Sequence, residues 1–184
     1  LLPGSRQHEV KRLLPEMSRT VDMLISRHDD IQVVVSRASS VEKELYQDIL
    51  NSNCNIKILE DQTYEIMNFS DLLIVASGTA TLESALFETP LIIVYKVDAV
   101  SYQIGKRLVK IKNIGLVNVI AEKTIVPEFI QNHFNRDELV PAAETLLYNT
   151  DVRAEIIADL KQIRSKLGQA GASKKAAELV LELM

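Results

Sequence analysis

Short, unbroken runs of apolar residues recur along this chain, separated by stretches in which apolar residues return every three or four positions. Unbroken runs rich in β-branched side chains are typical of strands buried on both faces, whereas the wider spacing is typical of a helix with one buried face. The strand-like runs lie at 31–35, 56–59, 72–75 and 91–95. Leu1-Leu2 has the same character, and we expect it to be the end of a strand whose beginning is missing.

Helical spacing fills the intervals between these runs. It predicts helices at about 10–25, 41–50, 64–67, 79–87 and 97–111, and a helical carboxyl-terminal third from about 136 to 184. Residues 115–126 are predicted to form a short strand and a loop. Strands that alternate with amphipathic helices imply a parallel sheet with helices on both faces, so the predicted fold class is α/β.

The composition fits a single packed domain over residues 1–184. The formal charge of −4 argues against a nucleic-acid-binding protein that relies on bulk electrostatics. Cys54 is the sole cysteine, so neither an internal disulfide nor a cysteine zinc site is expected, and a reducing cytoplasm fits. His8, His28 and His133 show no metal-ligand spacing, and no dinucleotide or P-loop glycine pattern occurs. We therefore expect neither a metal nor a cofactor.

The segment at residues 77–83 follows a buried strand and opens a helix. Ser77, Gly78, Thr79 and Thr81 supply hydroxyl and backbone donors at the positive end of the helix dipole, an arrangement that suits phosphate. Glu83, one turn further on, suits the paired hydroxyls of a sugar. Ordinary helix capping also explains hydroxyls and an acid at these positions.

A second turn, at residues 3–6, joins the first strand to the first long helix. Gly4 permits a tight turn, Ser5 is placed to cap the helix, and the fork of Arg6 can hold two phosphate oxygens. Arg6 is otherwise a solvated residue of the first helical turn. Both turns follow strands of the predicted parallel sheet, so they meet at the carboxyl edge where such sheets bind ligands.

Two further features have both a structural and a functional interpretation. Asn118 lies among apolar neighbours, where its amide orders a loop or contacts a substrate. Basic residues gather on the predicted helix at 97–112, where they form a solvated face or approach an anionic lipid surface. These basic residues are Lys106, Arg107, Lys110 and Lys112.

Taken in order along the chain, these segments resemble the lipid-A-disaccharide synthase family. The matching segments are 1–6, Glu9-Val10, 77–83, Pro90 with the strand that ends at Tyr95, 106–110, Asn118 and 126–131. Beyond residue 131 the resemblance is of helical character alone.

The resemblance implies a Rossmann-like domain that forms the donor-binding, carboxyl-terminal half of a GT-B glycosyltransferase. The family transfers 2,3-diacylglucosamine from its UDP derivative to the 6-hydroxyl of lipid X, giving the β-1,6-linked lipid A disaccharide of lipopolysaccharide. It works without a metal, as a cytoplasmic enzyme peripheral to the inner membrane. UDP-diacylglucosamine and lipid X are the implied substrates.

The resemblance also assigns roles to residues of this chain. Arg6 would bind the diphosphate and act in catalysis by neutralising charge on the departing UDP. Ser77, Gly78, Thr79 and Thr81 would hold the phosphates, with Gly4 and Ser5 shaping the turn around Arg6. Glu83 would accept hydrogen bonds from the ribose hydroxyls. Asn118 would lie at the edge of the site, against donor or acceptor.

The chain departs from the family pattern in two ways. Val117 stands where the family usually has proline before the asparagine, which puts the geometry of that loop in question. The resemblance also leads us to expect that the family's amino-terminal half, with the acceptor pocket and the carboxylate base, lies outside these residues. We therefore expect this chain alone to bind UDP weakly and to catalyse nothing.

Three other functions stay open from the sequence. One is a different GT-B enzyme, of the peptidoglycan glycosyltransferase or UDP-N-acetylglucosamine 2-epimerase type, although the 3–6 turn favours the lipid A enzyme. Another is a nucleotide-binding module without chemistry. The third is an oligomerisation domain, in which the carboxyl-terminal helices hold copies of the chain together.

Overall fold

The computed structural model describes residues 1–50, 56–98, 113–167 and 171–182. Every strand pairing in this part of the chain is parallel: the first strand with the second, the third with the fourth, and the fourth with the fifth. The strands are β1 (Val33–Arg37), β2 (Ile56–Glu60), β3 (Leu73–Ala76), β4 (Leu91–Tyr95) and β5 (Glu128–Ile130). The first four confirm the predicted strands, with shifts of one or two residues at their ends.

The first two residues join these strands into one sheet. Leu1 exchanges backbone hydrogen bonds of 2.7 and 2.9 Å with Val34 and Ser36 of β1. Leu2 exchanges bonds of 2.9 and 2.8 Å with the backbone of β3. The sheet order is therefore β2, β1, residues 1–2, β3, β4, β5. If residues 1–2 are counted as the first strand, this is the doubly wound order 3-2-1-4-5-6.

Helices cover the strands, as the buried sequence runs predicted. β3 is buried along its whole length and β4 along all but its last residue, which requires cover on both faces. The helices are α1 (Gln7–Arg27), α2 (Lys43–Leu50), α3 (Thr63–Phe69), α4 (Thr79–Leu86), α6 (Leu116–Ala121), α7 (Arg136–Tyr148), α8 (Thr150–Leu167) and α9 (Ala172–Glu182), with a 3-10 turn η1 (Gln131–His133).

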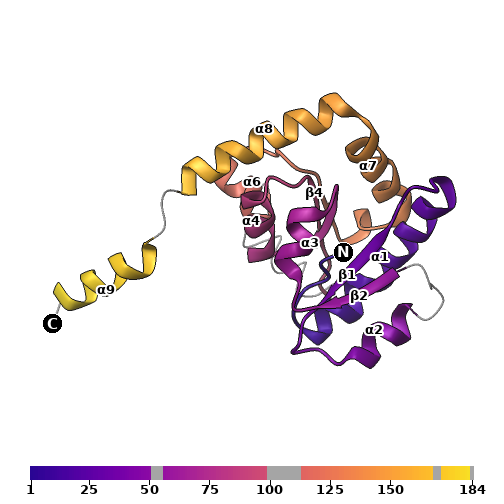
Figure 1. The fold of residues 1–184 in the computed structure, drawn as a ribbon, viewed down its shortest axis with the longest axis horizontal. Coiled ribbons are helices and arrows are strands. Elements are labelled where there is room, and N and C mark those ends of the chain that lie inside the picture. Colours follow the sequence, from indigo (N-terminus) through magenta and orange to yellow (C-terminus); the bar gives the residue numbers. More distant parts are fainter. Residues whose placement is uncertain (51–55, 99–112, 168–170, 183–184) are drawn as a thin grey trace.

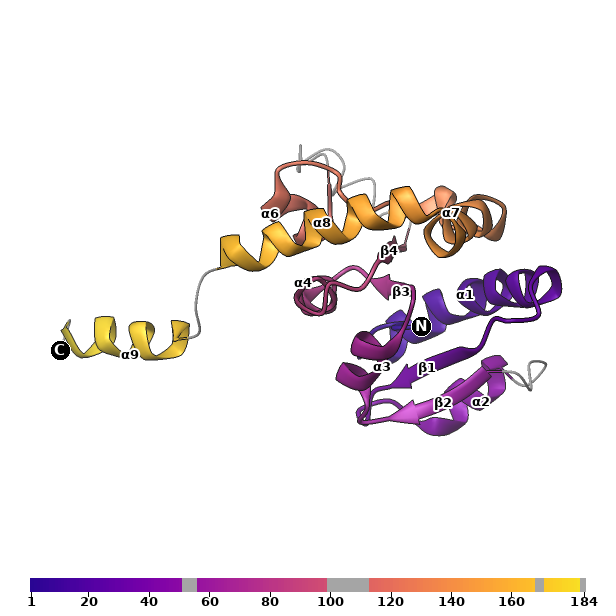
Figure 2. The same ribbon diagram turned by 45° about the horizontal axis from the view of Figure 1, so that its top comes forward.

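The helices pack in two groups. In one group α1 contacts α2 and α7, and in the other α4 contacts α3, α6 and α8. Figure 1 shows α8 running from α7 across to α4 and α6, so that it links the two groups. Both ribbon views show α9 standing apart from the rest of the chain (Figures 1 and 2). The helical carboxyl-terminal third is thus confirmed.

The prediction for residues 115–126 is wrong. The structure has a helix, α6, where a short strand was expected, and the strand β5 follows it. A short apolar run does not distinguish strand from helix by its periodicity. The backbone amides of Ile114 and Gly115, the two residues before α6, donate to the carboxylate of Glu128, which lies more than ten residues further along the chain. The helix predicted at 97–111 falls largely outside the described residues.

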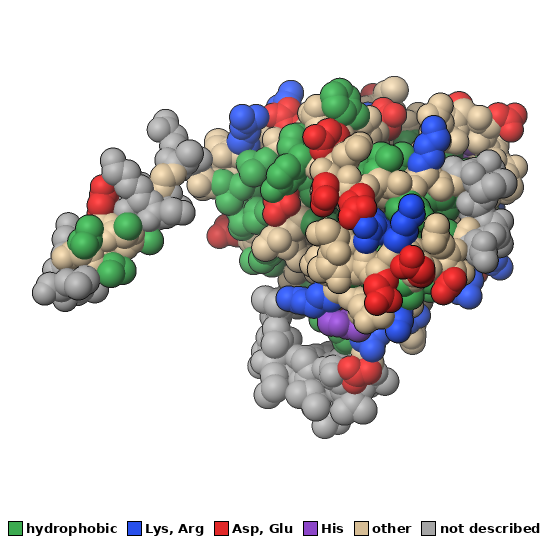
Figure 3. All heavy atoms as spheres, turned by 60° about the horizontal axis from the view of Figure 1, so that its bottom comes forward, with side chains coloured by type: hydrophobic (Ala, Val, Ile, Leu, Met, Phe, Trp, Pro, Cys, Tyr) green, Lys and Arg blue, Asp and Glu red, His purple; other side chains and the backbone are tan. Residues whose placement is uncertain are grey.

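Apolar side chains remain exposed on the helices of the second group. Tyr64 of α3 lies 6.0 Å from Phe87, between ring centroids, and Phe69 is 82% exposed. Figure 3 shows a group of apolar side chains on the side of the body that faces α9. The same view shows basic side chains and a histidine near the lower edge of this face.

Candidate functional site

A hollow of about 510 Å³ lies at the carboxyl edge of the sheet. Its lining comes from the start of α1, from the end of β3 and from the residues that follow β4. This is the point at which the strand order reverses, between residues 1–2 and β3, where doubly wound sheets bind their ligands. The lining residues include Arg6, His8, Glu9, Arg12, Ala76, Ser77, Tyr95, Lys96 and Asp98.

Gly4 has a conformation that other residues rarely adopt. Its φ is +103°, and a Cβ atom at this position would lie 2.4 Å from Oε2 of Glu9. The tight turn predicted at residues 3–6 is therefore confirmed, and glycine is required there by both the backbone and the neighbouring side chain.

The predicted helix cap at Ser5 is wrong. α1 begins one residue later than that cap requires, and Arg6 is its N-cap residue. The carboxylate of Glu9, three residues into the helix, accepts hydrogen bonds of 3.2 Å from the amides of Ser5 and Arg6. A capping Ser5 hydroxyl would accept from an amide of the first helical turn, whereas here it is the amides of Ser5 and Arg6 themselves that donate, to Glu9.

Glu9 is a residue of the site for which the sequence analysis gave no role. Its second oxygen, Oε1, accepts a 2.9 Å hydrogen bond from Nη1 of Arg6. The side chain of Arg6 is 71% exposed and that of Glu9 26% exposed. The Arg-x-x-Glu spacing at a helix start is the sequence signal that identifies such a pair.

The 77–81 turn brings one of its hydroxyl groups to the hollow. Ser77 lines the hollow and donates a 3.3 Å hydrogen bond to the carbonyl of Ile114. Gly78 is the N-cap residue of α4 and is exposed, and Thr79 begins the helix. Thr81 is buried, and its hydroxyl donates to the carbonyl of Gly78 at 2.8 Å. The buried hydroxyl of Thr81 therefore stabilises the first turn of α4.

Glu83 lies on α4, one turn beyond the start of the helix, and is partly buried. It is not one of the side chains that line the hollow. The structure thus brings Arg6 and Ser77 together, with Glu9 beside Arg6, and places Glu83 further along the neighbouring helix. Its contact with ribose stays a prediction.

Asn118 is fully buried, and its amide is engaged within the chain. Its nitrogen donates to the carbonyl of Val126 at 2.9 Å and to Oε1 of Glu128 at 2.7 Å. Its oxygen accepts from the amides of Ile125 and Val126 at 2.8 and 3.1 Å. Asn118 therefore orders the loop between α6 and β5, and its contact with a substrate stays a prediction.

Two side chains, one at the start of β5 and one directly after it, form hydrogen bonds to the backbone of the loops near the hollow. Glu128 accepts from the amides of Ile114 and Gly115 at 2.8 and 3.1 Å. Gln131 clamps the backbone of Val97, accepting from its amide at 2.9 Å and donating to its carbonyl at 3.1 Å. Val97 also lines the hollow, so Gln131 fixes one wall of it.

The basic cluster predicted on the 97–112 helix lies outside the described residues. Its members are Lys106, Arg107, Lys110 and Lys112. Within the described part of the chain, the basic residues that line the hollow are Arg6, Arg12 and Lys96, and its acidic residues are Glu9 and Asp98.

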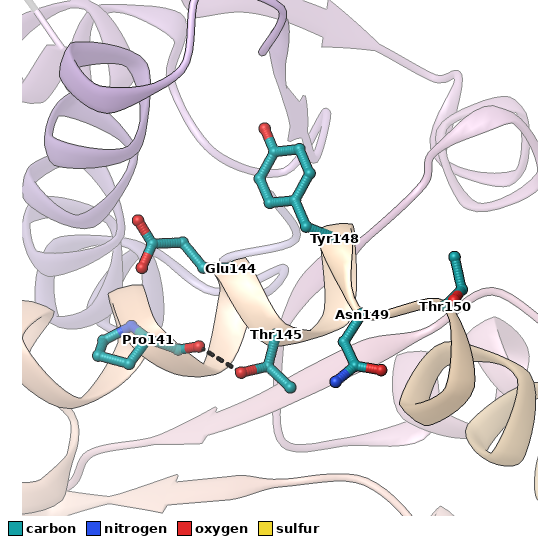
Figure 4. Close-up of a pocket in the computed structure, with 6 residues that line it drawn as sticks. All are labelled: Pro141, Glu144, Thr145, Tyr148, Asn149 and Thr150. Atoms are coloured by element: carbon teal, nitrogen blue, oxygen red, sulfur yellow. Dashed lines mark hydrogen bonds between the residues drawn. The ribbon is translucent and has the colours of Figure 1, made fainter.

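A second, more open hollow of about 620 Å³ lies where α7 meets α8. Figure 4 shows its six lining residues, with Tyr148 pointing away from Thr145 and Asn149. The hydroxyl of Thr145 donates to the carbonyl of Pro141 at 2.8 Å, and Glu144 pairs with His28 at 3.0 Å. These side chains serve helix contacts, and none of the predicted site residues lies here.

The described residues contain no group of three or more histidine, cysteine, aspartate or glutamate side chains arranged to hold a metal ion. Among the helices that the structure describes, none combines the length and the apolar character needed to cross a membrane.

Comparison with known proteins supplies the family. A model of the lipid-A-disaccharide synthetase family matches residues 1–183. The chain belongs to this family. It is 38% identical to the lipid-A-disaccharide synthase of Syntrophus aciditrophicus over 186 aligned residues, which cover all of this chain and 49% of the relative. The synthases of Geobacter sulfurreducens and Persephonella marina are 34% and 36% identical, and this chain covers 48% and 50% of them. The chain spans about half the length of the curated relatives it matches.

Proposed function

We propose that this chain is the UDP-sugar-binding half of a lipid-A-disaccharide synthase of the GT-B type. The observation that carries the proposal is that Arg6 and Ser77, from two turns more than seventy positions apart, line one hollow at the switch point of a doubly wound sheet. Membership of the family over residues 1–183 supports it. The length of the match, about half of each relative, suits one domain of a two-domain enzyme.

In the proposed reaction, the 6-hydroxyl oxygen of lipid X attacks the anomeric carbon of UDP-2,3-diacylglucosamine. The bond from that carbon to the phosphate oxygen breaks, the hydroxyl proton passes to a base outside this chain, and UDP departs. Negative charge then gathers on the diphosphate. The guanidinium of Arg6 stabilises that charge, which is the electrostatic effect that most often dominates catalysis.

The remaining site residues position the donor in this proposal. Ser77, with the exposed start of α4 at Gly78 and Thr79, holds the phosphates through hydroxyl and amide groups. Thr81 stabilises that helix start through its hydrogen bond to the carbonyl of Gly78. Glu83 accepts hydrogen bonds from the ribose hydroxyls.

The acceptor and donor of this reaction carry acyl chains, so the proposed enzyme works at the cytoplasmic surface of the inner membrane. We place it there as a peripheral protein. Exposed apolar residues on α9, among them Leu179 and Leu181, are 61% and 70% accessible. They suit a contact of this helix with another domain or another copy of the chain.

Calorimetric titration with UDP tests the donor role directly. We expect the wild-type chain to bind UDP, and Arg6→Ala and Glu83→Gln each to weaken binding by about 1–3 kcal/mol, because each loses a charge-assisted contact. Glu65, an acidic residue of α3, has no proposed role, so Glu65→Gln is a matched control for the loss of one negative charge. Equal UDP affinities in all four proteins would contradict the roles of Arg6 and Glu83, and no binding by the wild type would contradict the donor role of the chain.

A further inference from the structure

Glu9 places a negative charge inside the hollow in which an anionic ligand is proposed to bind. One oxygen of its carboxylate, Oε2, accepts from the amides of Ser5 and Arg6 at 3.2 Å. The other, Oε1, accepts from the guanidinium of Arg6 at 2.9 Å. The guanidinium that is proposed to hold the diphosphate therefore already holds an anion that belongs to this chain.

The position of Gly4 is adapted to this arrangement. A side chain at residue 4 would meet Oε2, Cβ and Cδ of Glu9 at 2.4, 3.0 and 3.2 Å. The turn thus leaves room for a carboxylate directly against its amides. A helix cap needs the hydrogen bonds from the two backbone amides but no contact with the guanidinium. Capping therefore explains the contacts of Oε2 of Glu9 and leaves the contact of Oε1 with Arg6 unexplained.

The same helix contains a second pair that shows what the ordinary version of this contact looks like. Glu16 and Arg19 have the same spacing and the same 2.9 Å separation, two turns further along α1. Neither residue lines the hollow, and the carboxylate of Glu16 also accepts from the amide of Arg136. The Glu9–Arg6 pair therefore differs from its neighbour in its location and in the order of its two residues, and it has the same separation.

We propose that Glu9 is an internal counter-ion that keeps the 3–6 turn and Arg6 in the arrangement that accepts an anion. When a diphosphate binds, it replaces Glu9 as the partner of the Arg6 guanidinium. This inference rests on the proposed function. Glu9 is a positioning residue in this role, because it acts on the ligand through Arg6. Two anions cannot both use one guanidinium without repulsion, so the charge of Glu9 opposes the binding of the diphosphate.

Replacing Glu9 by glutamine tests the inference with a gain in affinity. The variant Glu9→Gln keeps an oxygen for the two backbone amides and removes the negative charge. We expect it to bind inorganic pyrophosphate and UDP about fivefold more tightly than the wild type, which corresponds to releasing one partly exposed ion pair. Uridine, which has no phosphate, should bind both proteins equally. A gain of this kind does not arise from a damaged fold.

Two further variants of the full chain make the result specific. Glu16→Gln removes the same charge from the same helix outside the hollow, so its affinity for pyrophosphate should stay at the wild-type value. In an Arg6→Ala background, Glu9→Gln should give a smaller gain, because the pair it releases is already gone and only the direct repulsion between the two anions is left to relieve. Non-additivity of the two substitutions is the sign that Glu9 acts through Arg6.

Equal or weaker binding of pyrophosphate and UDP by Glu9→Gln would overturn the inference. A gain of the same size in Glu16→Gln would also overturn it, because the effect would then be one of net charge. If pyrophosphate binding rises in Glu9→Gln while the wild type binds UDP no better than pyrophosphate, the role of Glu9 stands and the uridine nucleotide of the proposed function is wrong. No binding of either anion by the wild type would overturn both.

Discussion

The two glycines of the site turns, Gly4 and Gly78, lie in opposite surroundings: the first is crowded and the second is open. Gly4 has a φ of +103° and crowds against Glu9, so the fold itself requires a glycine there. Gly78 has an extended backbone, with a φ of 169°, and a Cβ atom on it would find no atom within 4 Å. The chain alone gives no reason for a glycine at residue 78, and the open space beside it is where we propose that the phosphates approach.

Replacing each glycine by alanine separates a role in stability from a role in ligand binding. We expect Gly4→Ala to lower the free energy of unfolding by about 1–3 kcal/mol, because it strains the backbone and displaces Glu9. Gly78→Ala should leave that free energy within about 0.5 kcal/mol of the wild type and weaken UDP binding severalfold, because the methyl group occupies the space of the ligand. Urea denaturation and calorimetric titration measure the two effects. A Gly78→Ala variant with undiminished UDP affinity would show that no ligand approaches there.

At the scale of elements, the loop between α6 and β5 depends on one buried amide. Asn118 makes four hydrogen bonds to residues 125–128, and its side chain has no donor or acceptor left over. A buried amide that is removed leaves its former partners unsatisfied, which costs more than the hydrogen bonds themselves contribute.

Asn118→Ala therefore tests a structural role against a substrate contact. We expect it to lower the free energy of unfolding by about 3 kcal/mol, since buried backbone groups at Ile125 and Val126 lose their partner. Asn149→Ala is the matched control: that exposed asparagine accepts from the amides of Asp151 and Val152, and its loss should cost about 1 kcal/mol. Stability of Asn118→Ala equal to that of the wild type would instead favour a role in contact with the substrate.

Local patterns predicted the elements whose apolar runs are unambiguous, even where the strands that pair with them are distant in the sequence. The runs at 72–75 and 91–95 became β3 and β4 because continuous apolar character suits a strand buried on both faces. The helix α6 escaped prediction because the group that holds the two residues before it, the carboxylate of Glu128, comes from beyond the next loop. The cap of α1 was misassigned within one turn of the chain, because Arg6 rather than Ser5 is the N-cap residue and Glu9 accepts from the amides of both.

The candidate site divides in the same way. The sequence placed Arg6 and Ser77 at one edge of the sheet, and the structure brings both to one hollow. Glu9 was missed although its spacing from Arg6 is a local signal, whereas Glu128 and Gln131 hold residues 13 and 34 positions away, which are visible only in the folded chain. Side chains that shape a site through other residues leave little trace in a single sequence.

At the scale of the whole molecule, the site depends on where residues 1–2 lie. They form the central position of the sheet, between β1 and β3, and the 3–6 turn follows from them directly. The two turns that carry Arg6 and Ser77 are thus neighbours because their strands are neighbours. Anything that loosens residues 1–2 loosens the sheet and the site together.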